Sequence, residues 1–388
     1  MTTVQRLGYV PALDGLRAVA ISLVLSFHAF GWPPDGFLGV DMFFVLSGFL
    51  ITTLLLEEHA EHGTVSLREF YRRRALRLLP ALFAMLAICA PALALAGMNR
   101  ELVVKGVGAG AFYVTNLAIG LGGLEAVGFG HLWSLSLEEQ FYVLWPPLLF
   151  VVLRARIGIA LAVVTAASVL VVAQQARLLE AGAPGHRLDW SPDTRSGGIL
   201  IGCLTGLLLV RHRRLVLRAS RWLFAIALTL GGLIVVENVG RGLYAGFLTL
   251  FAVCCAIVIV RVVDRPGLVG AVLATRPLRF VGRISYALYL WHIPVFFVFG
   301  IDTFDRFAYG GPVRKVAAIA VSVGCATASY YLVELPFLRR KRARSLGAVQ
   351  CSSTGGRADV LSLEKRLNVL ACAPVEVRLR RDEQRHRE

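Results

Sequence analysis

Residues 14–30 read DGLRAVAISLVLSFHAF, and this apolar run contains an arginine, Arg17, and a histidine, His28. An apolar run of this kind is typical of a helix that crosses a membrane. A charged side chain at membrane depth costs about 2.5–3.5 kcal/mol by insertion scales and usually serves a function. The stretch therefore predicts a membrane-spanning helix and a functional site built into it.

The composition of the whole chain also indicates a membrane protein. Of the 388 residues, 56% are hydrophobic and 17% are charged, and the mean hydropathy is +0.66, far above that of an ordinary soluble domain. We expect an all-α fold, a polytopic membrane helical bundle with about ten transmembrane helices. Apolar runs of about 20 residues are centred near Val24, Val45, Leu86, Ala111, Leu144, Val164, Cys203, Leu230, Ala252, Leu290 and Ser322.

The basic residues lie where they explain topology better than nucleic-acid binding. The formal net charge is +16, but Lys and Arg gather in short loops, which marks the cytoplasmic side of a membrane. We therefore expect anionic lipid headgroups as partners and no nucleic acid. The protein is predicted to be a multi-pass protein of the plasma (inner) membrane. The basic loops cover residues 68–77, 154–156, 211–221, 261–265 and 339–344.

One of the eleven apolar runs does not fit this topology. Eleven spans would force the arginine-rich loop at 57–79 to the outside. The glycine-rich run at 102–121, which contains Lys105 and Asn116, is the weakest candidate, so we predict that it is broken, re-entrant or partly inserted. Ten spans then place both termini in the cytoplasm.

Two domains are expected. Residues 1–342 form the membrane domain, and 343–388 form a basic, disordered cytoplasmic tail with at most one short helix around 360–370. The seven cysteines have neither CxxC nor metal-ligand spacing, so we interpret them as packing residues and expect no metal site.

The arginine and the histidine of the opening stretch share one helix face. Eleven residues make almost three turns, which places His28 about 16 Å from Arg17 along the axis. Asp14, one turn before Arg17, is expected to pair with it. Alternatively, Arg17 reaches the inner headgroups and His28 is a satisfied core histidine. Two polar groups on one face favour a functional channel.

A carboxylate follows in the stretch GFLGVDMFFVLSGFLI. Asp41 opens the second span near the outer face and, after a short turn, is expected close to His28. It would fix the imidazole tautomer and support its positive charge. The alternative is an acid stabilised by the helix N-terminus.

The stretch FYRRRALRLLP carries a pair of arginines at the start of the third span. Arg74 and Arg77 are three residues apart and hence neighbours on one helix face. Two guanidinium groups suit a multiply charged phosphate ligand. A positive-inside flank is the alternative.

Acidic and aromatic residues meet in GHLWSLSLEEQFYVLWP. Ser136 and Glu139 have the spacing of a capping box, so Glu139 is interpreted as structural. Glu138 is not explained in that way. With Tyr142 one turn later, it is a candidate to orient a substrate hydroxyl or assist proton transfer.

Two further polar residues precede prolines. His292 lies in RISYALYLWHIPVF and Glu334 in YYLVELPFLRR. Such single residues are often packing or capping features, so both rank below His28. His292 is kept as a candidate substrate contact.

Taken together, these motifs resemble the acyltransferase 3 family of integral membrane O-acyltransferases. The resemblance rests on five motifs in order, between about residues 9 and 337. They are the Arg17–His28 spacing, GVDMFFVLSGFLI, the Arg74 and Arg77 pair before Pro80, WSLSLEEQFY and YALYLWHIP.

The resemblance implies an acyl-coenzyme A co-substrate, no permanently bound cofactor, and an acceptor hydroxyl on a sugar or sugar-bearing molecule. It implies that Arg17 and His28 are essential and that Arg74 and Arg77 hold the donor. Some members carry a further hydrolase-like domain, and this sequence is expected to be a stand-alone member. Such members modify cell-surface polysaccharides and lipids, commonly by O-acetylation, or acylate macrolides.

The spacing of the candidate residues suits this chemistry. The phosphates of coenzyme A would lie by the cytoplasmic arginines, and the thioester would arrive near His28, which would act as a general base. No serine or cysteine is evidently paired with His28, so direct transfer is predicted. A polytopic transporter is the alternative, because intramembrane polar residues also suit a carrier.

Overall fold

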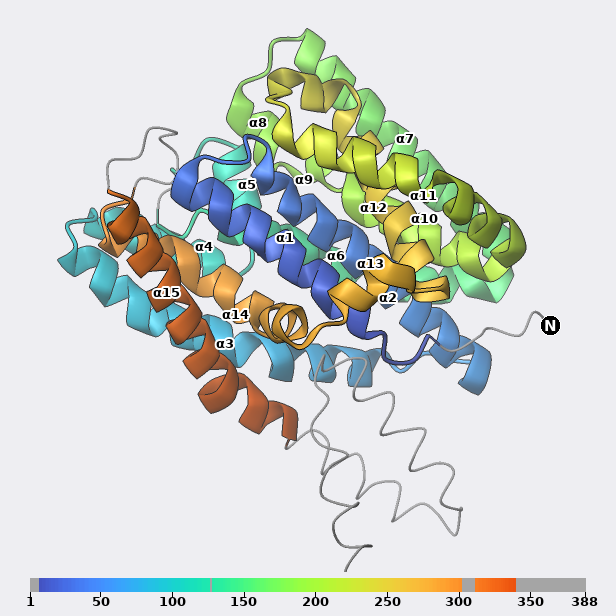
Figure 1. Cartoon of the computed structure of the whole chain (residues 1–388), viewed down its shortest axis with the longest axis horizontal. Coiled ribbons are helices and arrows are strands. Elements are labelled where there is room, and N and C mark those ends of the chain that lie inside the picture. The colour runs from blue at the N-terminus through green and yellow to red at the C-terminus, as the bar shows by residue number, and fades with distance from the viewer. Residues whose placement is uncertain (1–6, 126–127, 302–310, 340–388) are drawn as a thin grey trace, which may run out of the picture.

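Every regular element that the computed structural model describes is a helix (Figure 1). The structure describes residues 7–125, 128–301 and 311–339, so the proposed tail at 343–388 lies outside the described residues. The predicted all-α class is confirmed. The helices are α1 (Pro11–Phe30), η1 (Gly36–Leu38), α2 (Gly39–His62), α3 (Leu67–Leu95), α4 (Arg100–Ala111), α5 (Thr115–Gly120), α6 (Leu132–Ala155), α7 (Ile157–Glu180), α8 (Gly185–Trp190), α9 (Pro192–Arg195), α10 (Gly197–Arg211), α11 (Arg213–Val236), η2 (Gly240–Ala245), α12 (Phe247–Asp264), α13 (Gly267–Leu273), α14 (Arg276–Val298), α15 (Pro312–Ala328) and η3 (Ser329–Glu334).

Eight helices in the described ranges are long and apolar enough to cross a membrane, namely α1, α2, α3, α7, α11, α12, α14 and α15 with its extension. Two more predicted spans correspond to α6 and α10. Helix α10 has 15 residues, and α6 contains Glu138, Glu139 and Gln140, which lower its hydropathy. The helical membrane bundle is confirmed, with eight of the ten expected spans supported by length and composition alone.

The apolar run at 102–121 is interrupted, as predicted. Helix α4 ends at Ala111, α5 begins at Thr115, and between them Tyr113 adopts a positive φ of 53°. Gln140 of α6 stabilises the break, because its Nε2 donates to the Tyr113 carbonyl at 2.9 Å and to Asn116 Oδ1 at 2.9 Å. Backbone groups freed inside a bundle need such partners.

Helices α1 and α2 occupy the middle of the bundle in Figure 1, with α3 and α15 on one side and α7, α11 and α12 on the other. The most extensive contacts join α2 to α10 and α1 to α14. Two large clusters of buried apolar side chains fill the two sides. The central pair therefore contributes to both halves of the core.

Glycine allows α2 and α10 to approach closely. A Cβ on Gly48 would lie 2.0 Å from the Ile199 carbonyl oxygen, and a Cβ on Gly202 would lie 2.2 Å from the Val45 carbonyl oxygen. Small residues at helix contacts are typical of membrane bundles, where close backbone packing replaces the hydrophobic driving force.

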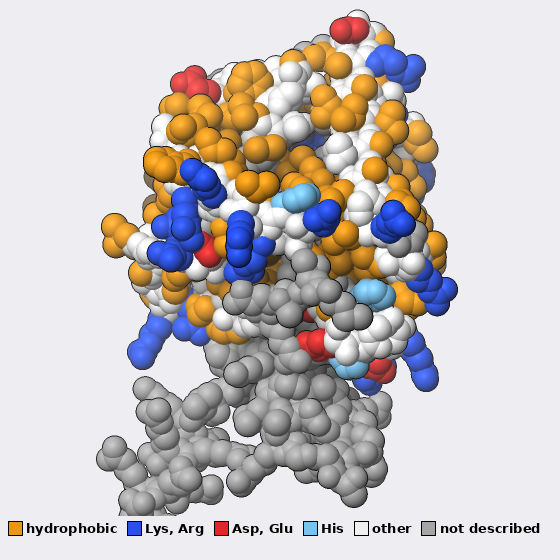
Figure 2. All heavy atoms as spheres, turned by 90° about the vertical axis from the view of Figure 1, so that its right-hand side faces the viewer, with side chains coloured by type: hydrophobic (Ala, Val, Ile, Leu, Met, Phe, Trp, Pro, Cys, Tyr) orange, Lys and Arg blue, Asp and Glu red, His pale blue; other side chains and the backbone are white. Residues whose placement is uncertain are grey.

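Basic side chains are visible on the face of the bundle that lies to the right in Figure 1. Figure 2 shows Lys and Arg side chains there, spread among apolar ones. The five cysteines in the described ranges are free, and four of them are buried, consistent with the interpretation of these five as packing residues.

Candidate active site

Two pockets lie back to back inside the bundle and share Val40 of α2 and Tyr289 of α14. The first, which we call the arginine pocket, has a volume of about 140 Å³ and is lined by Arg17, Arg73, Arg74, Arg77, Glu138 and Glu139, among others. The second, the histidine pocket, has about 210 Å³ and is lined by His28, His131, Trp133, Asp189, Trp190 and Arg195, among others.

Helix α1 connects the two pockets along one face. Arg17 lines the arginine pocket and His28 the histidine pocket, which matches their predicted separation of about 16 Å along the helix. The predicted pair of Arg17 with Asp14 is present, with Nη1 donating to Oδ1 at 3.3 Å. Asp14 also accepts a hydrogen bond of 2.7 Å from the Tyr9 hydroxyl, so Arg17 is held from outside the pocket.

The structure brings Arg74 and Arg77 into the arginine pocket together. Arg74 donates to Glu139 Oε1 from Nη2 at 2.6 Å and from Nε at 3.2 Å. Its Cζ lies 3.2 Å from the centroid of the Tyr142 ring. Arg74 is therefore fixed in place by a charge-assisted pair and a cation–π contact.

The predicted capping box is wrong. Helix α6 begins at Leu132, four residues before Ser136. Ser136 is thus inside the helix, where its hydroxyl donates to the Leu132 carbonyl at 2.9 Å. Glu139 is instead the partner of Arg74 from the opposite helix. The sequence missed this pair, because 65 positions separate the two residues.

Glu138 lies in the arginine pocket and not beside His28. Tyr142 donates to its Oε1 at 2.5 Å, and the Ser47 hydroxyl donates to the same oxygen. The predicted neighbour relation of Glu138 and Tyr142 is present. Two groups are expected to take part in catalysis, the Glu138 carboxyl group and the His28 imidazole. They line different pockets.

Three histidines cluster at the histidine pocket, namely His28 of α1, His292 of α14 and His131, which directly precedes α6. The ring centroid of His292 lies 5.3 Å from that of His28 and 5.4 Å from that of His131. His292 is 0% exposed and lines neither pocket, so the geometry does not support its expected substrate contact. No motif in the sequence marks His131. In the described ranges, no group of three His, Cys, Asp or Glu residues is arranged to hold a metal ion.

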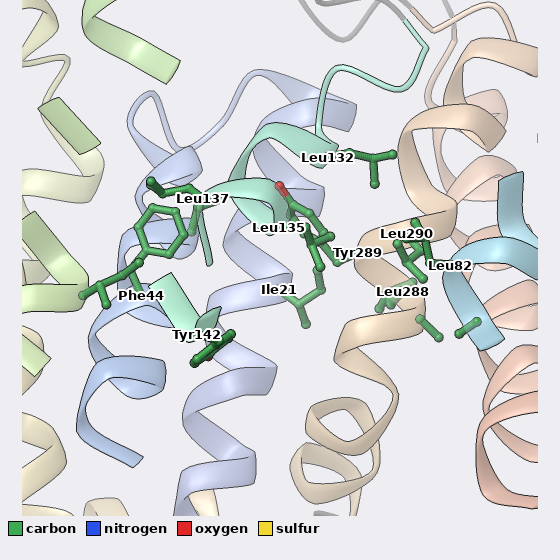
Figure 3. Close-up of a cluster of buried hydrophobic side chains, with 14 of the residues drawn as sticks. Ile21, Phe44, Leu82, Leu132, Leu135, Leu137, Tyr142, Leu288, Tyr289 and Leu290 are labelled. Carbon is green, nitrogen blue, oxygen red and sulfur yellow. The ribbon is translucent and has the colours of Figure 1, made fainter. Parts of the chain in front are cut away.

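Tyr289 forms the wall between the pockets. Figure 3 shows it on α14 with Ile21 of α1 and Leu135 of α6 nearby. Its hydroxyl donates to the His131 carbonyl at 2.8 Å and lies 2.6 Å from Ser134 Oγ. These bonds attach the wall to the first turn of α6.

Asp41 has a different partner from the one expected. Arg195 Nη2 donates to Asp41 Oδ2 at 2.8 Å, and the two side chains are 1% and 5% exposed. Nδ1 of His28 has no hydrogen-bond partner among the described residues, so the predicted support of its imidazole by Asp41 is not what the structure shows. Arg195 lies 154 positions away from Asp41, at the end of the short helix α9, which the sequence pattern does not reveal.

The segment that carries Arg195 is fixed by two further carboxylates. Arg187 donates to Asp193 at 2.7 and 2.5 Å, which holds the pKa of Asp193 below its usual range. The Tyr244 hydroxyl donates to Asp189, and burial raises the pKa of Asp189. Asp189 lines the histidine pocket, whereas Asp193 does not.

The fold and the two pockets define a multi-pass membrane protein with a buried polar site. A family model described as an acyltransferase domain matches residues 10–331, and the chain belongs to this acyltransferase 3 family. The resemblance inferred from the motifs is therefore confirmed.

Curated relatives of the chain carry acetyltransferase names. The chain is 32% identical over 308 residues to the peptidoglycan O-acetyltransferase OatA of Listeria monocytogenes serovar 1/2a, covering 74% of this chain and 49% of OatA. It is 34% identical over 355 residues to YrhL of Bacillus subtilis (strain 168), provisionally named a peptidoglycan O-acetyltransferase, covering 84% of this chain and 55% of YrhL. The chain thus spans about half the length of these relatives. No solved structure matches the chain.

Proposed function

We propose that the chain is a membrane O-acyltransferase that moves an acyl group, acetyl in the first instance, from acyl-coenzyme A to a hydroxyl of a glycan or sugar-bearing acceptor. One observation carries this proposal. The arginine pocket and the histidine pocket share Val40 and Tyr289 and are joined by the Arg17–His28 face of α1.

The arginine pocket suits the donor. Four arginines and two glutamates line it, so its formal charge is positive. Guanidinium groups bind phosphate with well-defined geometry, and coenzyme A is rich in phosphate. The apolar lining, which includes Phe43, Phe44 and Leu50, suits the long thin arm that ends in the thioester.

His28 suits the role of general base at the junction. It lines the histidine pocket, which shares Val40 and Tyr289 with the arginine pocket. The acceptor hydroxyl oxygen attacks the thioester carbonyl carbon while His28 takes the hydroxyl proton. The new C–O bond forms, the C–S bond breaks, and the coenzyme A thiolate receives the proton from His28. General-base catalysis is typically worth about 10²–10⁴ in rate.

The acceptor would enter from the side of the membrane opposite to the donor. Because basic loops mark the cytoplasmic face, we expect the arginine pocket toward the cytoplasm and the histidine pocket toward the outside of the inner membrane. Relatives named as peptidoglycan O-acetyltransferases favour a cell-surface glycan as acceptor. A macrolide-type acceptor offers the same chemistry, a hydroxyl on a ring or a sugar.

The proposal is tested with full-length protein in lipid nanodiscs, labelled acetyl-coenzyme A, and a panel of glycan and macrolide acceptors. We expect labelled acceptor from the wild type and none from His28→Ala. Exchange of acceptor across vesicle membranes without consumption of donor would establish the carrier alternative and overturn the proposal. Label retained on the protein before acceptor is added would exclude direct transfer.

A further inference from the structure

We propose that the histidine pocket binds an uncharged sugar ring of the acceptor, with Arg195 and Asp189 bonding its hydroxyls and Trp190 packing on its apolar face. The inference rests on the proposed function, since it deepens the acceptor side of the same site. The supporting observation is the environment of Arg195, a residue that no motif in the sequence identifies.

Arg195 has hydrogen-bonding capacity that the protein does not use. Its Nη2 donates to Asp41 at 2.8 Å, but Nε and Nη1 are buried and have no partner among the described residues. Buried donors without partners are costly and rare, so each needs an explanation. Arg195 lines the histidine pocket, and a ligand with several acceptor oxygens would supply the partners.

The charges around Arg195 favour a neutral ligand. Asp41 already balances the guanidinium through a buried ion pair. Asp189 adds a second carboxylate to the pocket lining, and Arg195 is the single Lys or Arg among the lining residues, all of which lie in the described ranges. An anionic group would therefore meet a surplus of carboxylate, whereas hydroxyls can donate to Asp189 and accept from Arg195.

The aromatic residues complete the pattern of a sugar site. The indole of Trp133 is already engaged, because the Arg195 Cζ lies 5.3 Å from its ring centroid. Trp190 also lines the pocket and directly follows Asp189 in the chain. A pyranose has an apolar face and a rim of hydroxyls, which matches an indole next to an arginine and a carboxylate.

The same pocket contains His28. A ring held by Arg195, Asp189 and Trp190 would therefore present one of its hydroxyls to the proposed base. In this arrangement Asp189, Trp190 and Arg195 select the acceptor, whereas the arginine pocket selects the donor. Variants of the two pockets should then separate acceptor binding from donor binding.

The test measures sugar binding without donor, by saturation-transfer NMR on full-length protein in nanodiscs. The probes are the methyl pyranosides of glucose, galactose and N-acetylglucosamine and the matching uronates, which add a carboxylate to the same ring. We expect at least one neutral pyranoside to bind about tenfold more tightly than its uronate. Preference for a uronate, or no binding of any neutral pyranoside, would overturn the inference.

Substitutions test which residues bind the sugar. Asp189→Asn keeps an oxygen for the Tyr244 hydroxyl but removes the charge, and we expect it to weaken binding of the neutral sugar about tenfold, the effect of one strong hydrogen bond. Trp190→Ala should do the same. The matched controls are Asp264→Asn, at the end of α12, and Trp222→Ala, 76% exposed on α11, because neither residue lines the pocket. Equal effects of a variant and its control would contradict the assignment.

A parallel transfer assay with acetyl-coenzyme A separates the two proposals. Sugar binding that depends on Asp189 without any transfer would sustain the inference and overturn the proposed function. Transfer whose acceptor KM is unchanged by both Asp189→Asn and Trp190→Ala would sustain the proposed function and overturn the inference.

Discussion

The imidazoles of His28 and His292 lie with their ring centroids 5.3 Å apart, although their helices α1 and α14 are near opposite ends of the described chain. His292 Nδ1 lies 2.6 Å from the Tyr289 carbonyl. A carbonyl only accepts hydrogen bonds, so Nδ1 carries the proton and the ring orientation of His292 is fixed. His292 therefore forms a rigid wall behind His28 and is not itself in contact with either pocket.

Replacing His28 with alanine should remove the base. We expect a loss of acyl transfer of about 10²–10⁴, with thermal unfolding of the purified protein changed little. The measurement is the initial rate with labelled acetyl-coenzyme A in nanodiscs. If the variant keeps more than a tenth of the wild-type rate, another group must act as the base.

His292→Asn tests the wall behind His28. Asparagine can still donate to the Tyr289 carbonyl but lacks the far side of the ring, so His28 would lose its packing partner. We expect kcat to fall about 10- to 100-fold through misplacement of the base, with both KM values unchanged because His292 lines neither pocket. A rise in acceptor KM alone would instead support the original expectation of a substrate contact.

Arg74→Lys tests the donor pocket. Lysine can form neither the two-nitrogen contact with Glu139 nor the stacking contact with Tyr142. We expect the KM for acetyl-coenzyme A to rise about tenfold, with the acceptor KM unchanged. The control is Arg72→Lys, because Arg72 pairs with Glu69 and does not line the pocket. Equal effects of the two substitutions would exclude a donor role for Arg74.

The sequence predicted the fold class and part of the site for a physical reason. Membrane helices are recognised from local hydropathy, and residues on one helix face, such as Arg17 and His28, from helical spacing. Partners brought together by packing leave no local signal. The sequence pattern predicts that Asp41 pairs with His28, but its partner is Arg195 at the end of the distant helix α9. His131 was likewise not singled out, although the fold places it in the histidine cluster.

The Asp41–Arg195 pair should matter strongly for stability. Breaking a buried ion pair leaves an uncompensated charge, and we expect Asp41→Asn to lower the free energy of unfolding by about 3 kcal/mol. The matched control is Asp264→Asn, since Asp264 pairs with the 46% exposed side chain of Arg221 and should contribute less than about 1 kcal/mol. Both values come from denaturant unfolding in detergent. If Asp41→Asn lowers the free energy of unfolding by less than the control does, the Asp41–Arg195 pair is dispensable for folding.

The close contact of α2 with α10 gives a test of the bundle that is independent of the chemistry. In Gly202→Ala, the new Cβ would lie 2.2 Å from the Val45 carbonyl oxygen, so the helices must separate. Overpacking of this kind costs about 1–3 kcal/mol, and Phe44 and Val45 of α2 would shift with the helix, so both stability and transfer should fall. Gly232→Ala on α11 is the control, because a Cβ there meets nothing within 4 Å and alanine favours a helix by up to about 1 kcal/mol. A Gly202→Ala protein that unfolds at the same temperature as Gly232→Ala would mean that α2 and α10 are not packed as closely as described.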